Sequence, residues 1–119
     1  MSDLTITRGD DPIFDLYLAT ASGAADLDGV ELWFTAKENV YDKDDRAILQ
    51  KTTSSGINVI DEAGGHVEIV IDHVDTMNLR ARYLGVPLVY DVQLKDALGS
   101  IQTVAAGTIT IDPDVTHST

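Results

Sequence analysis

Cysteine is absent from this sequence of 119 residues, so neither a disulfide framework nor a thiolate zinc site is available to the fold. The opening residues, Met1 to Leu4, show neither the basic nor the apolar segment of a secretory signal. No apolar run approaches the roughly 20 residues that a membrane-spanning helix needs. We therefore expect a protein that is made and folded in the cytoplasm.

Positive charge is also scarce in this chain. Asp and Glu number 20 against 8 Lys and Arg, which gives a formal net charge of −12. Because such an acidic surface repels phosphate groups and anionic lipids, we expect no binding of nucleic acid or membranes. The simplest interpretation of the charge is solubility, and steering toward a basic partner is the alternative.

Apolar side chains recur at every second position, which is typical of half-buried strands. In residues 14–18, Phe14, Leu16 and Leu18 alternate with Asp15 and Tyr17, and residues 30–37 repeat the pattern. The spacing predicts an all-β fold of seven to nine short strands in a single domain over residues 1–119, with a polar tail from about residue 113. Two packed antiparallel sheets are the expected arrangement, and a small barrel is the alternative.

Several local features refine this prediction. The first strand and residues 47–52, anchored by Ile48, lack a strong two-sided apolar pattern and are expected at sheet edges. Gly107 interrupts the last strand and predicts a bulge or a close backbone approach. At most one helical turn is expected, within residues 72–79, where Asp72 or Asp75 accepts backbone N–H bonds as a cap.

Residues for covalent catalysis are missing from the sequence. There is no cysteine and no G-x-S-x-G motif, the serines fall in turns or in the tail, and the three histidines are far apart. Neither glycine-rich phosphate-binding motif occurs. We expect a protein that is not an enzyme and that needs no cofactor.

Asp42, Asp44 and Asp45 cluster carboxylates of the kind that ligate calcium. The segment lacks the glycine and the distal glutamate of an EF-hand loop. A solvated acidic loop is the simpler interpretation, and we expect no metal site, with these three aspartates as the calcium candidates if one exists.

Trp33 and Tyr17 are the candidate interface residues. By alternation, Trp33 faces away from the Leu32 and Phe34 side of its strand, and Tyr17 faces away from Leu16. If the two strands are neighbours, both rings share an outer face, where aromatic side chains are enriched at interfaces. Cover by a loop or the tail, or a register shifted by one residue, is the alternative for Trp33.

Several segments together resemble a known protein family. They are residues 7–11 leading into 13–18, residues 27–29 and 34–37, residues 89–94 with Asp96, Gly99, Thr103 and Gly107, and the ending 111–116. This pattern, spread over nearly the whole chain, is similar to the small immunoglobulin-like virion proteins of tailed bacteriophages, in particular the amino-terminal domain of baseplate upper proteins. The resemblance implies an immunoglobulin-like β-sandwich in a tail tip, baseplate or fibre attachment. Longer members carry an attached fibre or coiled-coil region and this sequence stops at Thr119, so a head–tail or capsid accessory piece is also compatible.

Three functional hypotheses follow. The first, which the resemblance implies, is a non-enzymatic virion module that binds other virion proteins and copies of itself and forms part of the virion after folding in the host cytoplasm. The second is a carbohydrate-binding module that uses Trp33, assisted by calcium at Asp42, Asp44 and Asp45. A small enzyme ranks third, because the sequence offers no candidate pair of nucleophile and base.

Overall fold

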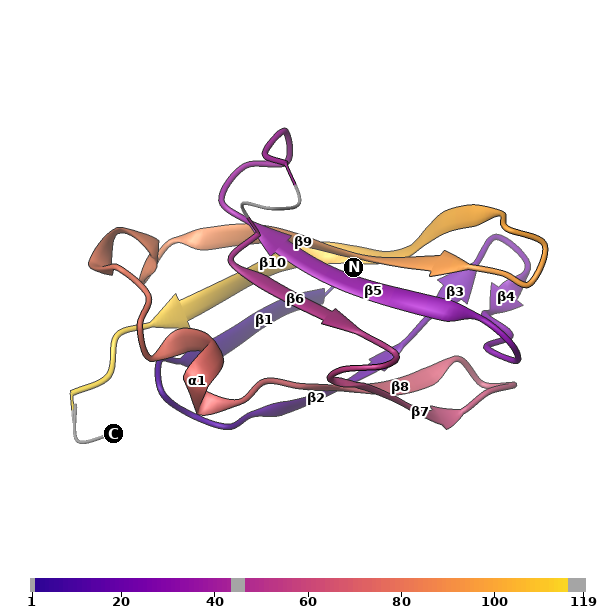
Figure 1. Cartoon of the computed structure of the whole chain (residues 1–119), viewed down its shortest axis with the longest axis horizontal. Helices are drawn as coiled ribbons and strands as arrows, with labels where there is room; N and C mark the ends of the chain where they lie inside the picture. Colours follow the sequence, from indigo (N-terminus) through magenta and orange to yellow (C-terminus); the bar gives the residue numbers. More distant parts are fainter. Residues whose placement is uncertain (1, 44–46, 116–119) are drawn as a thin grey trace.

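The computed structural model describes residues 2–43 and 47–115, which form two β-sheets lying one above the other (Figure 1). The larger sheet has the strand order β1-β10-β9-β5-β6, the smaller one has the order β2-β8-β7, and β3 pairs with β4 in a short ladder. The elements are β1 (Ser2–Thr7), β2 (Ile13–Tyr17), β3 (Ala19–Thr20), β4 (Gly23–Ala24), β5 (Glu31–Lys37), β6 (Leu49–Thr52), β7 (Ile57–Asp61), β8 (His66–Val70), α1 (His73–Thr76), the 3-10 turn η2 (Ala81–Tyr83), β9 (Pro87–Lys95) and β10 (Ile101–Asp112).

The all-β prediction is confirmed, but the strand count differs. The described residues form ten strands, whereas the sequence predicts seven to nine. The additional strands β3 and β4 have two residues each. Two residues are too few to show an alternating pattern, so such strands leave no signal in the sequence.

One hydrophobic core lies between the two sheets. Leu32 and Phe34 of β5 are fully buried, and Val67 and Ile69 of β8 face them from the other layer. The rings of Phe34 and Tyr90 lie 5.3 Å apart at a tilt of 36° and fill the centre of the larger sheet's inner face. Burial of each such side chain contributes about 1.5–3 kcal/mol, so the alternation that predicts the strands also supplies the main stabilising term.

The larger sheet is not wholly antiparallel, as the sequence predicts, because the first and last strands, β1 and β10, pair in parallel. Leu4 lies opposite Ile109 and Ile6 opposite Ile111. After β1 the chain turns at Gly9, which has a φ of 84°, and crosses to β2 in the other sheet. β1 forms no hairpin with β2, because β2 lies in the other sheet. Its neighbour is instead β10, at the far end of the chain, which runs in the same direction.

Both predicted edges are confirmed, since β1 and β6 are the outer strands of the larger sheet. The predicted anchor of β6 is wrong by one position: Leu49 is buried, and Ile48 is only half-buried. Of the two alternatives predicted for Gly107, the bulge is wrong, and a close backbone approach stays a prediction. The register shifts between Thr103 and Ala105, where Val104 is the extra residue, and Val104 is buried because the bulge turns it toward the core.

The expected helical turn is present at α1, within residues 72–79. Asp75 accepts the backbone N–H of Asp72 at 2.8 Å, which confirms the predicted use of these aspartates at the helix start. The second turn, η2, lies outside that range and carries no sequence signal. In the described part of the chain, neither turn is long and apolar enough to cross a membrane.

The beginning of the predicted tail is held against the domain. Arg8 Nε donates to Asp114 Oδ1 at 2.8 Å, and the backbone N–H of Arg8 donates to the carbonyl of Asp112 at 2.9 Å. The backbone N–H of Gly9 donates to Thr76 Oγ1 at 2.9 Å, and Thr76 is fully buried. These contacts tie the turn after β1 to both α1 and the end of β10.

Candidate functional site

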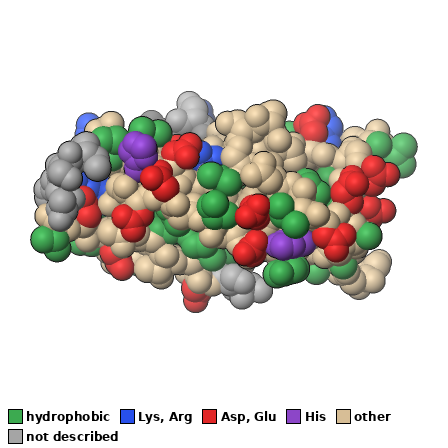
Figure 2. Space-filling view, turned by 90° about the horizontal axis from the view of Figure 1, so that it is seen from below, with side chains coloured by type: hydrophobic (Ala, Val, Ile, Leu, Met, Phe, Trp, Pro, Cys, Tyr) green, Lys and Arg blue, Asp and Glu red, His purple; other side chains and the backbone are tan. Residues whose placement is uncertain are grey.

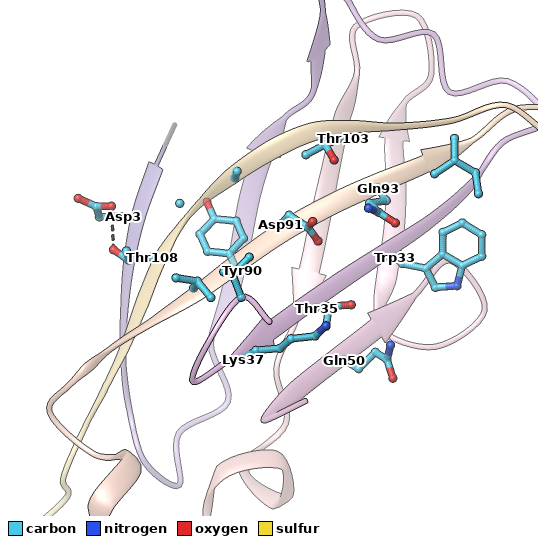
Figure 3. A pocket seen from close by; sticks show the side chains of 15 residues that line it. Asp3, Trp33, Thr35, Lys37, Gln50, Tyr90, Asp91, Gln93, Thr103 and Thr108 are labelled. Carbon is cyan, nitrogen blue, oxygen red and sulfur yellow. Dashed lines mark hydrogen bonds between the residues drawn. The ribbon is translucent and has the colours of Figure 1, made fainter. Parts of the chain in front are cut away.

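A groove of about 820 Å³ lies on the outer face of the larger sheet, away from the core (Figure 3). We call it the outer groove. It is lined by Asp3, Trp33, Thr35, Lys37, Val40, Gln50, Val89, Tyr90, Asp91, Gln93, Ile101, Thr103, Ala106, Gly107 and Thr108. Most of these residues are the outward members of strands whose inward members form the core, so the pattern that builds the core also builds the groove.

The strand register arranges the lining side chains in cross-strand rows. The first row runs from Trp33 on β5 through Gln93 on β9 to Thr103 on β10. The second row runs from Gln50 on β6 through Thr35 and Asp91 to Ala106. The third runs from Lys37 through Val89 and Thr108 to Asp3. Successive rows are about 7 Å apart, because they are two residues apart along β5 and β9, and on β10 the bulge at Val104 adds one residue between the first row and the second.

Trp33 is half-buried and points into the outer groove, as Figure 3 shows, so its predicted outward orientation is confirmed. Tyr17 does not share that face. Its strand β2 pairs with β8 in the smaller sheet, whereas β5 pairs with β6 and β9 in the larger one. The two aromatic candidates therefore lie on different sheets, and the interpretation of a common aromatic surface is wrong.

Polar contacts within the groove fix some of its side chains. Thr108 Oγ1 donates to Asp3 Oδ1 at 2.8 Å, which links β10 to β1 at one end. Lys37 Nζ donates to the carbonyl of Asp42 at 2.8 Å, which holds the loop after β5 beside the groove. The amides of Gln50 and Gln93 make no hydrogen bond within residues 2–43 and 47–115, so these two groups are available to a ligand.

Tyr90 belongs to the core and is only 4% exposed, and it also borders the floor of the groove. Burial raises the pKa of Tyr90 above its ordinary value of 10.0, and the nearby carboxylate of Asp3 raises it further. The phenol therefore stays neutral at physiological pH and presents an uncharged surface.

Tyr17 belongs to a small cluster on the outer face of the smaller sheet. Its ring is 71% exposed and stacks on His66 with centroids 4.5 Å apart. His66 Nε2 lies 2.9 Å from Asp15 Oδ1. Figure 2 shows this side of the molecule, where Asp and Glu side chains and histidines are spread over the surface. Acidic side chains of this cluster and its surroundings give this face a negative charge.

The calcium candidates are only partly described. Asp42 is used locally, because its Oδ2 accepts the backbone N–H of Asn39 at 3.2 Å. Asp44 and Asp45 lie outside the described residues, so calcium binding by this loop stays a prediction. Within the described ranges, no three Asp, Glu or His side chains gather closely enough to hold a metal ion.

Sequence reasoning did not identify most of the outer groove. Gln93, Asp91 and Thr103 each occupy an outward strand position, which is the only signal that they carry. What brings them beside Trp33 is the register between β5, β9 and β10, and the sequence does not contain that register explicitly.

In comparisons with known proteins, no protein-family model and no curated protein matches this chain.

Proposed function

We propose that this protein is a non-enzymatic structural module of a bacteriophage particle, an immunoglobulin-like sandwich in a tail tip, baseplate or fibre attachment. In this proposal it acts through contacts with other virion proteins and with copies of itself. The resemblance of the sequence to virion proteins of tailed bacteriophages supports a place in the virion. The arrangement of two sheets around one core is compatible with the fold that the resemblance implies.

The observation that supports an assembly role is the difference between the two edges of the larger sheet. The β6 edge is short and carries an inward-pointing charge, Lys51, a feature by which proteins prevent a further strand from pairing. The β1 edge has six residues, and its inward positions Leu4 and Ile6 are apolar. The β1 edge is therefore the one suited to pair with another strand.

The hydrogen bonds show which backbone groups of β1 point outward. The backbone N–H of Arg8 donates to Asp112 of β10. Since backbone groups alternate sides along a strand, Ile6 and Leu4 also face β10, whereas Thr5 and Asp3 direct their N–H and C=O groups away from the sheet. Among the described residues, no strand pairs with these outward groups.

In our proposal, two copies join through their β1 strands in antiparallel pairing about a two-fold axis. Such an interface is self-complementary, because each outward N–H of one copy meets an outward C=O of the other. A stable contact needs burial on the order of 1,000 Å² or more, so side chains beside the edge must also take part.

The test is the replacement of one outward N–H. Thr5→Pro removes the outward donor of β1 and leaves the bonds to β10 intact, because proline is tolerated on an edge strand with that orientation. Thr5→Ala is the matched control, since it keeps the N–H. We expect light scattering to show a concentration-dependent dimer for the natural chain and for Thr5→Ala, and a monomer for Thr5→Pro.

The full-length chain is used in all three measurements, with circular dichroism to establish that each variant is folded. A natural chain that stays monomeric at high concentration, and that captures none of the purified virion proteins of a phage encoding it, contradicts the proposal. A dimer that survives Thr5→Pro unchanged contradicts the assignment to β1.

A further inference from the structure

The lining of the outer groove combines an apolar surface with many side chains that form hydrogen bonds. Gln50 and Gln93 each offer a donor and an acceptor, Thr35 and Thr103 do the same through a hydroxyl, and Asp91 offers acceptors. A ligand that matches this set must itself carry many donors and acceptors close together. Polyhydroxylated molecules have this property, and apolar molecules do not.

Most of the groove lies over the central strands β5, β9 and β10, and only Asp3 and Gln50 of its lining come from the edge strands β1 and β6. β9 and β10 are paired on both sides, and so is β5, so their backbone N–H and C=O groups are already bonded. An extended peptide gains most of its affinity at a sheet from backbone hydrogen bonds at an edge, and this site offers none. Recognition here depends on side chains.

Trp33 is the largest apolar side chain of the site, which also contains Val40, Val89 and Ile101. Its indole lies at one end of the first row, with Gln93 and Thr103 extending from it across the sheet (Figure 3). A sugar ring has an apolar face of C–H groups and a rim of hydroxyls. With that face on the indole, the rim is directed toward the amide of Gln93 and the hydroxyl of Thr103.

Charge limits the class of ligand. The charged residues of the lining are two carboxylates, Asp3 and Asp91, and one ammonium, Lys37. The whole chain carries a net charge of −12. An anionic polymer is repelled, and one excess carboxylate in the groove offers little to a polycation, so a neutral ligand fits best.

We propose that the outer groove binds a neutral oligosaccharide, with one sugar ring stacked on Trp33 and its hydroxyls bonded by Gln93, Gln50 and Asp91. This activity goes beyond the assembly role and uses a different surface, since the groove lies on the face of the sheet and the β1 interface at its edge. Calcium has no part in it.

Trp33 is the only tryptophan of the chain, so intrinsic fluorescence reports on this site alone. The full-length protein is titrated with cellohexaose, maltohexaose, chitohexaose and mannohexaose as neutral probes. Hexagalacturonate serves as the anionic probe and hexalysine as the basic peptide probe. We expect a saturable change in tryptophan emission with at least one neutral sugar and no comparable change with either charged probe. The proposal is overturned if none of the four neutral sugars changes the tryptophan emission, or if a charged probe binds equally well.

Variants then locate the binding. Gln93→Ala keeps the fluorescent reporter and is expected to weaken the affinity for the bound sugar by about 3- to 10-fold, the loss of one hydrogen bond. Tyr17→Ala is the matched control, because it removes an exposed aromatic ring from the other sheet and should leave the affinity within about twofold. Trp33→Ala removes the fluorescent reporter, so binding by this variant is measured by calorimetry. Its affinity for the sugar should be at least about tenfold lower.

Binding that Gln93→Ala and Trp33→Ala leave unchanged excludes the outer groove as the site. Thr5→Pro should bind the same sugar with unchanged affinity. Failure of sugar binding and failure of β1 pairing are therefore distinguishable, since each has its own variant and its own measurement.

Discussion

Lys51 points into the molecule from the edge strand β6, and its Nζ lies 2.7 Å from Asp75 Oδ2 in α1. The lysine side chain is 10% exposed and the aspartate side chain 24%. Asp75 also accepts the backbone N–H of Asp72. The ion pair therefore joins α1 to the edge of the larger sheet. A further strand that paired with β6 would cover the charge of Lys51.

The first prediction concerns this ion pair. Lys51→Met keeps the length of the side chain but leaves Asp75 without its cation. Breaking a fully buried pair costs 3–5 kcal/mol, and the partial exposure of Asp75 reduces the expected loss of unfolding free energy to about 1–3 kcal/mol. Urea unfolding measures this loss of unfolding free energy. Lys95→Met, at the exposed end of β9, is the control and should stay within about 0.5 kcal/mol of the natural chain. Equal stability of the two variants contradicts this role.

The second prediction concerns Gly65, in the hairpin before β8. Gly65 has a φ of +69°, and an added Cβ would lie 2.4 Å from the carbonyl oxygen of Leu18 and 3.2 Å from the backbone nitrogen of Ala25. Because backbone atoms cannot move aside cheaply, Gly65→Ala should cost about 2–4 kcal/mol in thermal or urea unfolding. Gly29→Ala is the matched control, with a φ of +71° and nothing within 4 Å. It should cost only the conformational term of about 1–2 kcal/mol, and equal losses would refute the clash.

The third prediction concerns stability at high pH. Burial and the neighbouring Asp3 raise the pKa of Tyr90 in the folded state above the value of about 10 that applies when the chain is unfolded. The unfolded state thus loses the proton first, so this stabilisation is complete below pH 10 and is lost as the pH rises through the folded-state pKa.

Urea unfolding between neutral pH and about pH 11 checks this dependence. The natural chain should lose stability above pH 10 more steeply than Tyr90→Phe, which cannot ionise. Tyr41→Phe is the control, because the Tyr41 ring is 92% exposed, and it should follow the natural chain. Parallel curves for the natural chain and Tyr90→Phe would contradict the assignment.

The fourth prediction concerns acid stability. Asp11 Oδ1 accepts the backbone N–H of His73 at 2.6 Å and lies 2.9 Å from His73 Nδ1. These hydrogen bonds lower the pKa of Asp11 below its ordinary value of 3.8. The stabilisation is therefore present above about pH 4 and is lost as the pH falls through the lower folded-state pKa.

Asp11→Asn removes this titration. Below about pH 4 the natural chain should lose stability faster than the variant does, as followed by thermal unfolding at a series of pH values. Asp28→Asn provides the comparison, because the carboxylate of Asp28 accepts no hydrogen bond from any described residue. An identical acid dependence for the natural chain and Asp11→Asn would show that the contact with His73 contributes nothing.

The sequence by itself determined the longer strands and which of their side chains face inward, but not the two-residue strands β3 and β4. Leu32, Phe34 and Ala36 are buried as the alternation requires, and β1 and β6 are edges as their weak apolar patterns indicate. Alternation is a local property, because each residue's face is fixed by the pleat of its own strand. For the same reason the outward position of Trp33 could be predicted.

Only the tertiary structure decided which strands are neighbours. It paired β1 with β10 in parallel, separated Tyr17 from Trp33 by placing their strands in different sheets, and put the bulge at Val104. These pairings join segments as far apart as the two ends of the chain, and they form only when the whole core closes. The candidate site depends on them, because the groove beside Trp33 exists only once the register of β5, β9 and β10 has aligned their outward side chains in rows.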